Sequence, residues 1–240
     1  MVLPASTSTR VGRASPLHRL SQAQRLDLKP SAVARVGLYG GAFDPPHVAH
    51  HRLAQTAIDQ LALDVLYVVP TGHAWHKQRP LSPAVHRLAM TRLHFQDLAK
   101  VVVDAREMNR DGPSYTLDTL KELQGMHAPS CHWFLVMGED QRARFHTWHQ
   151  WAAIAQLATL AVAHRTDDAA ASDPHLADMQ PGFANANTAL TIQWLEMPAM
   201  NVSATDIRQR AALGQSLQGL VQESVAQYIQ QHHLYQDTHD

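Results

Sequence analysis

Several features are scarce in this sequence of 240 residues, and each scarcity excludes a class of protein. Cys131 is the only cysteine, so neither an internal disulfide nor a zinc site built from several cysteines can form. No apolar run approaches the roughly 18 residues that a membrane-spanning helix needs. The formal net charge is only −1, so no general attraction to nucleic acid or to an anionic membrane is expected. We therefore expect a cytoplasmic protein with no nucleic-acid or membrane partner, in which a few placed groups make any phosphate site.

The composition of the whole chain, 45% hydrophobic and 17% charged, is typical of a globular protein. The first 33 residues differ from the rest, because they are rich in Ser, Ala and Arg and contain only one acidic residue, Asp27. This composition overlaps with that of organelle transit peptides, but it lacks the apolar centre of a secretory signal. We expect residues 1–33 to be a flexible N-terminal extension and residues 34–240 to form a single domain.

Beyond this extension, short runs of β-forming residues alternate with helical patterns. Strands are predicted at 36–39, 65–69, 101–105, 133–137, 159–163 and 192–195, and helices at 47–61, 82–98, 116–124, 147–157, 203–212 and 221–232. Because the predicted strands are apolar throughout, they indicate a parallel sheet that helices cover on both faces. The sequence therefore predicts a doubly wound, mostly parallel α/β fold with a helical segment at its C-terminal end.

The stretch Gly40–His50, which reads GGAFDPPHVAH, follows the first predicted strand and is the richest in candidate ligand groups. It has neither the three spaced glycines of a dinucleotide fingerprint nor the Gly-Lys-Ser/Thr of a P-loop. Its paired glycines let the backbone pass close to a ligand, and the following helix start offers N–H groups. His47 and His50 lie on the same side of the first turn, where two imidazoles suit a polyphosphate. The competing interpretation is a helix start with surface histidines, since the chain has 17 of them.

Further candidate groups follow the later predicted strands, where a parallel sheet binds its ligands. They are Lys77, Gly112–Thr116, Gly138–Asp140, Phe145–Trp148 and Asn201–Arg208. Lys77 is notable because the chain has only four lysines. Ser203 and Asp206 have the spacing of a capping box, so both could simply close a helix N-terminus. Thr205 and Arg208 then remain for a ligand, and the planar guanidinium fork suits a phosphate.

Two of these stretches resemble the signatures of the nucleotidyltransferase superfamily. Gly40–His50 resembles its GG-x-FDP-x-H-x-GH signature, and residues 202–208 resemble its (I/V)S-x-T-x-IR motif. The Gly-Pro-Ser-Tyr-Thr, Gly-x-Asp and Phe-x-x-Trp elements between them resemble bacterial nicotinate-nucleotide adenylyltransferases in particular. The resemblance runs from about Val36 to Tyr235, with the motifs in the same order. It implies transfer of the adenylyl group of ATP to nicotinate mononucleotide, which releases pyrophosphate and makes nicotinate adenine dinucleotide for NAD synthesis.

The resemblance also implies a role for each matching residue. On the ATP side, His47, His50 and Arg208 would be catalytic, and Gly40, Gly41, Gly138, Asp140, Ser203 and Thr205 would bind the nucleotide. On the mononucleotide side, Lys77 would place the phosphate, Tyr115 and Thr116 would bind the nicotinate carboxylate, and Trp148 would stack on the pyridine ring. The partners implied are thus ATP and nicotinate mononucleotide.

The expected mechanism needs neither a general base nor a covalent intermediate, because the acceptor phosphate is already an anionic nucleophile. Catalysis would consist of positioning and of charge stabilisation during an in-line displacement at the α-phosphorus. Mg²⁺ would arrive with ATP and keep much of its water shell. We expect no dedicated metal site in the protein, and we interpret Asp44 as an anchor for its own turn.

The sequence departs from the family pattern at three places. Ala49 and Ala42 replace residues that are usually Gly and Thr or Ser, and each change is small. The Thr71–Lys77 loop lacks the usual Pro-Pro before His-Lys, which weakens the assignment of Lys77. Two alternatives stay open: the same chemistry on nicotinamide mononucleotide or phosphopantetheine, and a nucleotide-binding module without catalysis.

Overall fold

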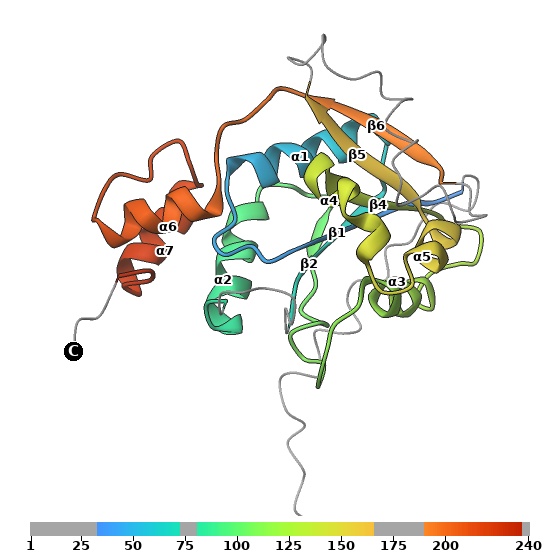
Figure 1. The fold of residues 1–240 in the computed structure, drawn as a ribbon, viewed down its shortest axis with the longest axis horizontal. Helices are drawn as coiled ribbons and strands as arrows, with labels where there is room; N and C mark the ends of the chain where they lie inside the picture. Colours follow the sequence, from blue (N-terminus) through green and yellow to red (C-terminus); the bar gives the residue numbers. More distant parts are fainter. Residues whose placement is uncertain (1–32, 73–80, 166–189, 237–240) are drawn as a thin grey trace, which may run out of the picture. The chain divides into compact units, whose positions relative to one another are not determined.

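The computed structural model describes residues 33–72, 81–165 and 190–236 (Figure 1). Its centre is a sheet of six strands: β1 (Arg35–Gly41), β2 (Val65–Pro70), β3 (Val101–Val103), β4 (His132–Gly138), β5 (Thr159–Arg165) and β6 (Ile192–Met197). The strand order is β3-β2-β1-β4-β5-β6, and every neighbouring pair is parallel. The predicted parallel α/β fold is therefore confirmed. The third strand ends two residues earlier than predicted, at Val103.

The helices are α1 (Val48–Gln60), α2 (Ala84–Phe95), α3 (Thr116–Gln124), α4 (Glu139–Ala143), α5 (Trp151–Leu157), α6 (Ala204–Ala212) and α7 (Glu223–Gln231), with a 3₁₀ turn η2 (Phe145–Thr147). The helix predicted at 147–157 is wrong at its start. Trp148 is extended, and Gln150 has a left-handed backbone with a φ of 51°, so the helix begins only at Trp151. Helix α4 was not predicted, because five residues are too few to show a helical period.

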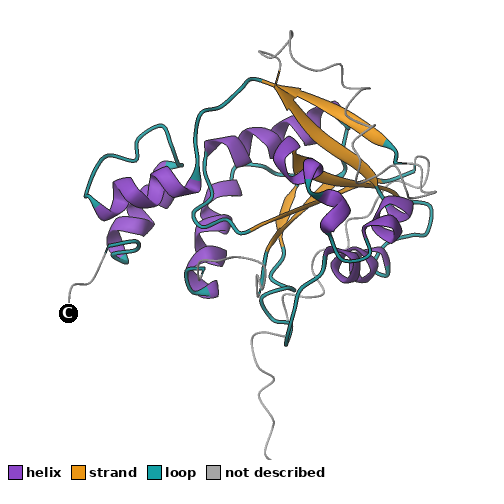
Figure 2. Cartoon of the chain, in the orientation of Figure 1, coloured by secondary structure: helices purple, strands orange, loops and turns teal. Residues whose placement is uncertain are grey.

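Helices cover both faces of the sheet (Figure 2). In β4, Trp133, Leu135 and Met137 pack into a core with residues of α3 and α5, whereas Phe134 and Val136 pack into a second core with residues of α1 and α2. This alternation follows from the two-residue period of a strand. Both sets are apolar because neither face meets water, which is why the strands read as continuous apolar runs.

The two C-terminal helices form a third, smaller core away from the sheet. Ile207 of α6 and Val225 and Ile229 of α7 pack with Met90 of α2, and Figure 1 shows the two helices beside that helix. The carbonyl of Leu220, between them, accepts the backbone N–H of Val48 at 3.0 Å. The C-terminal segment therefore lies directly against the first turn of α1.

The strand order creates a switch point between β1 and β4. From β1 the chain proceeds through α1 to β2 on one side, whereas from β4 it proceeds to β5 on the other. Sheets of this kind bind ligands in the crevice beyond the carboxyl ends of the two central strands. In the described ranges, no helix has the length and apolar character needed to cross a membrane.

Candidate active site

The first turn of α1 holds His47 and His50 in a fixed pair. Their rings stack with centroids 3.7 Å apart, and the backbone N–H of His47 donates to Nδ1 of His50 at 3.1 Å. Because Nδ1 accepts that hydrogen bond, the neutral His50 ring carries its proton on Nε2. Phe43 packs edge-on against the same ring, with centroids 5.1 Å apart. The structure thus fixes both the orientation and the tautomer of His50.

His47 is buried, with only 9% of its surface exposed. Burial lowers its pKa from 6.5 to about 4, so the ring is neutral near pH 7. Its Nδ1 atom is buried and has no hydrogen-bond partner among the described residues. His47 is therefore a neutral imidazole near pH 7.

We predict that stability falls as the pH drops below 6.5. Burial lowers the pKa of His47 to about 4 and, together with His51, that of His94 to about 3. Between pH 6.5 and these values the unfolded chain binds more protons than the folded one, so acid favours unfolding. At pH 5 each histidine would cost roughly 2 kcal/mol of unfolding free energy relative to pH 7. Urea unfolding at both pH values measures the loss. His94→Gln should reduce the loss by about half, and an equal loss in that variant would contradict the assignment.

Asp44 lies in the loop between β1 and α1, and it joins three segments of the chain. Its side chain is buried, and its carboxylate accepts the Tyr235 hydroxyl at 2.8 Å and the backbone N–H of Ser82 at 3.1 Å. Its backbone carbonyl accepts Nη1 of Arg208 at 2.8 Å. Asp44 thus links the loop after β1 to the start of α2 and to the C-terminal helices.

The Tyr235→Phe variant tests this link. Removing a hydrogen bond to a buried carboxylate should lower the unfolding free energy by about 2 kcal/mol, because Asp44 loses one of its partners. Tyr228→Phe is the matched control, since the hydrogen-bond partner of that hydroxyl within the described ranges is the ring of His86, at 3.0 Å. We expect a loss below about 1 kcal/mol in the control. Equal losses of unfolding free energy in the two variants would show that the hydrogen bond to Asp44 stabilises the fold no more than the bond to His86 does.

The terminal motif meets the first loop through Arg208. Besides the Asp44 carbonyl, the guanidinium bonds Oγ1 of Thr205 at 3.0 Å, across one turn of α6. Ser203 is the N-cap of α6, and its hydroxyl accepts the backbone N–H of Asp206 at 3.1 Å. Arg208 and Asp44, which are 164 positions apart in the sequence, are therefore in contact. The capping function expected of Ser203 is confirmed.

The end of β4 lies beside the end of β1, at the switch point. A Cβ on Gly138 would lie 2.7 Å from Oδ1 of Asp140, so the glycine lets this carboxylate fold back over the strand end. Asp140 also acts on Tyr39 of β1, whose pKa is raised mainly by burial and further by that charge. A Cβ on Gly40 would meet no heavy atom of the described chain within 4 Å, whereas Gly41 is packed against Phe43. The strand end at Gly40 is thus open.

A second group of predicted residues gathers around the start of α3. Tyr115 is the N-cap of α3, and Thr116 is its first residue. The Tyr115 ring stacks on His149, with centroids 4.2 Å apart and an interplanar angle of 29°. Trp148 is partly buried and packs edge-on against Phe145 at 5.4 Å. Tyr115 therefore lies next to the residue that follows Trp148, and His149 is a neighbour that the sequence reasoning missed. Lys77 lies outside the described residues.

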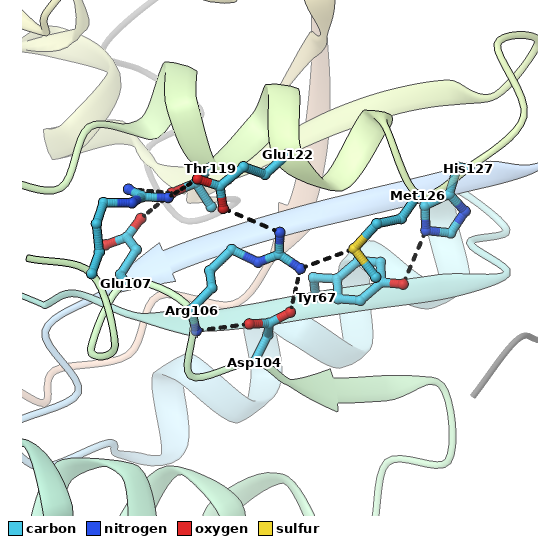
Figure 3. A network of polar contacts seen from close by, with 9 residues as sticks. Tyr67, Asp104, Arg106, Glu107, Thr119, Glu122, Met126 and His127 are labelled. Carbon is cyan, nitrogen blue, oxygen red and sulfur yellow. Dashed lines mark hydrogen bonds and ion pairs between the residues drawn. The ribbon is translucent and has the colours of Figure 1, made fainter. Parts of the chain in front are cut away.

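A network of charged side chains holds the loop before α3, and the sequence reasoning missed it as well (Figure 3). Arg106 bonds Asp104 at 2.6 Å and Glu122 of α3 at 3.4 Å. Glu107, which is only 7% exposed, accepts the Thr119 hydroxyl at 2.8 Å. The only sequence signal was the unusual density of charge between β3 and α3. The network fixes α3, and with it Tyr115, to the end of β3.

Comparison with known proteins identifies the family of this chain. The family model described as cytidylyltransferase-like matches residues 38–210. A relative from Albidiferax ferrireducens, named as a probable nicotinate-nucleotide adenylyltransferase, is 50% identical over 84% of this chain and 98% of its own length. A relative of the same name from Methylibium petroleiphilum is 42% identical over 87% of this chain and 95% of its own.

The solved structures show the same fold. The Plasmodium falciparum nicotinic acid mononucleotide adenylyltransferase complexed with NaAD superposes with a TM-score of 0.67 at 16% identity, over 84% of this chain and 97% of that one. At this identity the likeness concerns the fold alone, whereas the sequence matches cover the site motifs. The chain therefore belongs to the cytidylyltransferase-like family and, within it, to the nicotinate-nucleotide adenylyltransferases.

Proposed function

We propose that this chain transfers the adenylyl group of ATP to the phosphate of nicotinate mononucleotide, which yields nicotinate adenine dinucleotide and pyrophosphate. The observation that carries the proposal is the contact between the two most distant motifs. Arg208 of α6 bonds the carbonyl of Asp44, three residues before His47 at the start of α1. One guanidinium and two imidazoles at a helix N-terminus form a compact set of donors for a triphosphate.

On the ATP side, each group of the set would act on a different part of the nucleotide. The Nε2–H of His50 and the neutral ring of His47 would bind phosphoryl oxygens, and Arg208 with Thr205 would bind them from the opposite side. Gly40 and Gly41 would let the backbone approach the phosphates, while Gly138 and Asp140 at the end of β4 would contact the ribose and adenine. Ser203 would support this site as the cap of α6.

On the acceptor side, the start of α3 would bind the pyridine carboxylate. The first intrahelical hydrogen bonds of α3 are donated by Asp118 and Thr119 to the Tyr115 carbonyl, so the N–H groups of Thr116 and Leu117 precede the helical ladder. Such N–H groups suit an anion, with the helix dipole adding to the attraction. Trp148 would stack on the ring, and Lys77 would place the phosphate.

The chemistry would be a direct in-line attack by the acceptor phosphate on the α-phosphorus. The residues named above supply position and positive charge in the transition state, and none needs to remove a proton. Mg²⁺ would come bound to ATP and neutralise phosphate charge, with Arg208 adding positive charge and His50 donating its Nε2–H to a phosphoryl oxygen. We further propose that residues 34–240 act as one domain in the cytoplasm. Of the N-terminal extension expected at residues 1–33, all but Val33 lies outside the described residues.

The acceptor is tested by pyrophosphate release from the purified chain with Mg-ATP. Nicotinate mononucleotide, its amide and phosphopantetheine are offered separately, and we expect a strong preference for the acid. Preference for the amide or for phosphopantetheine would reject the pyridine pocket while leaving the phosphate site. Inactivity with all three acceptors would favour a nucleotide-binding module without catalysis.

A further inference from the structure

Arg87 of α2 is almost completely buried, yet it is charged and has no part in the transfer described above. Only 2% of its surface is exposed. Its guanidinium donates to four backbone carbonyls: to Thr71 at 2.7 Å, to Ser82 at 3.0 Å, to Ala42 at 3.1 Å and to Gly72 at 3.4 Å. A buried cation is costly unless its donors are satisfied, so this position strongly depends on the four carbonyls.

The carbonyls come from segments that are separate in the sequence. Ala42 belongs to the loop after β1, which continues to His47, and Thr71 and Gly72 follow the end of β2. The two strands are neighbours, and the backbone N–H of Thr71 donates to the carbonyl of Gly41 at 2.8 Å. Arg87 therefore joins the two loops at the point where both leave the sheet. The Asp44 carboxylate provides a nearby negative charge that favours the cationic form.

On the side away from Arg87, Gly72 packs closely against the loop that precedes α3. A Cβ on Gly72 would lie 2.0 Å from the carbonyl oxygen of Glu107 and 2.9 Å from Oγ of Ser114. The Glu107 side chain in turn accepts the Thr119 hydroxyl of α3 at 2.8 Å (Figure 3). A continuous line of contacts thus runs from the loop after β1 through Arg87, Gly72 and Glu107 to α3.

We propose that Arg87 is a positioning residue that couples the ATP loop after β1 to the turn after β2 and, through Gly72 and Glu107, to the helix that binds the mononucleotide. The naming of the two substrates rests on the proposed function, whereas the mechanical coupling of the two loops does not. A residue that merely fills the core would affect stability alone. A coupling residue must affect the binding of both substrates at once, because each substrate contacts one end of the line.

The Arg87→Lys variant separates these two roles. Lysine keeps the charge but loses the planar fork, so it cannot bond four carbonyls that lie in different directions. We expect the KM for ATP and the KM for nicotinate mononucleotide each to rise at least tenfold, as misplaced loops would cause. Thr91→Val is the matched control: Thr91 is fully buried one turn further along α2, and in the part of the chain that the structure describes its hydroxyl donates to the carbonyl of Arg87, at 2.7 Å. The control should lower stability and leave both KM values within about twofold of the wild type. A folded Arg87→Lys variant in which either KM is unchanged would overturn the proposal.

Native-state hydrogen exchange on the unaltered protein tests the coupling without any variant. The hydrogen-bonded amide of Val48, at the end of the loop after β1, and that of Thr71, after β2, should open in one cooperative step with the same dependence on denaturant. Separate opening of the two amides would overturn the coupling. Hydrogen exchange tests the coupling even if Arg87→Lys fails to fold, because it uses the unaltered protein. It also tests the coupling if the chain proves inactive with nicotinate mononucleotide, because it needs no substrate. Failure of the proposed function and failure of the coupling are therefore distinguished.

Discussion

The His50→Ala variant should lose about a thousandfold in kcat while its fold remains intact. The His50 ring is held by the N–H of His47 and by Phe43, so its Nε2–H is a pre-oriented donor at the start of α1. Removal of one such donor from a transition state with developing negative charge typically costs 100- to 1,000-fold in kcat. Alanine is a good helix former, so α1 itself should persist. Steady-state kinetics with Mg-ATP and circular dichroism measure the two quantities.

His51→Ala is the control for this variant. His51 is the next residue of the same helix, but its ring bonds the Asp97 carboxylate at 3.0 Å, away from the first loop. We expect its kcat to stay within about threefold of the wild type, since an exposed pair of this kind contributes little. Near-normal turnover in His50→Ala, or an equal loss in both variants, would remove His50 from the catalytic residues.

The Gly72→Ala variant should lower the free energy of unfolding by about 4 kcal/mol. The added methyl carbon would lie 2.0 Å from the backbone carbonyl oxygen of Glu107, which is far too close for two heavy atoms that are not bonded to each other. Relief requires a shift of the backbone, which would disturb the hydrogen bond from Arg87 to Gly72 and the packing of Gly72 on Glu107. Urea unfolding measures the loss, and the same protein should bind nicotinate mononucleotide more weakly.

Gly40→Ala is the matched substitution at an open position. A Cβ there meets no heavy atom of the described chain within 4 Å, so the unfolding free energy should change by less than about 1 kcal/mol. The same methyl would stand where the backbone approaches the ATP phosphates, so the KM for ATP should rise. A loss of stability equal to that of Gly72→Ala would contradict the steric account of both sites.

The sheet could be predicted from the sequence because its signal is local. Each buried strand is a continuous apolar run, and the alternation of strands with helices follows the chain. The segment after β4 could not be predicted, since the short α4 and the left-handed Gln150 interrupt any helical period. Trp148 consequently lies in a turn between two helices, not on the helix predicted there.

The phosphate loop and the terminal motif could be found because both are compact sequence patterns. Their contact through Arg208 could be expected only from the family resemblance, since 164 residues separate the partners. Arg87 and Glu107 could not be found at all. In the sequence they are ordinary charged residues on a helix and in a loop, and only the folded chain surrounds them with carbonyls and hydroxyls. Burial of a charge is a tertiary property, and no local pattern encodes it.

The most direct test of the central claim is to follow the α-phosphoryl group itself. The purified chain is incubated with Mg²⁺, nicotinate mononucleotide and ATP that carries a radiolabel on its α-phosphorus. The account predicts that all transferred label appears in nicotinate adenine dinucleotide, in step with pyrophosphate release and with no label on the protein. Label found only in AMP, or bound covalently to the chain, would contradict direct transfer to the mononucleotide.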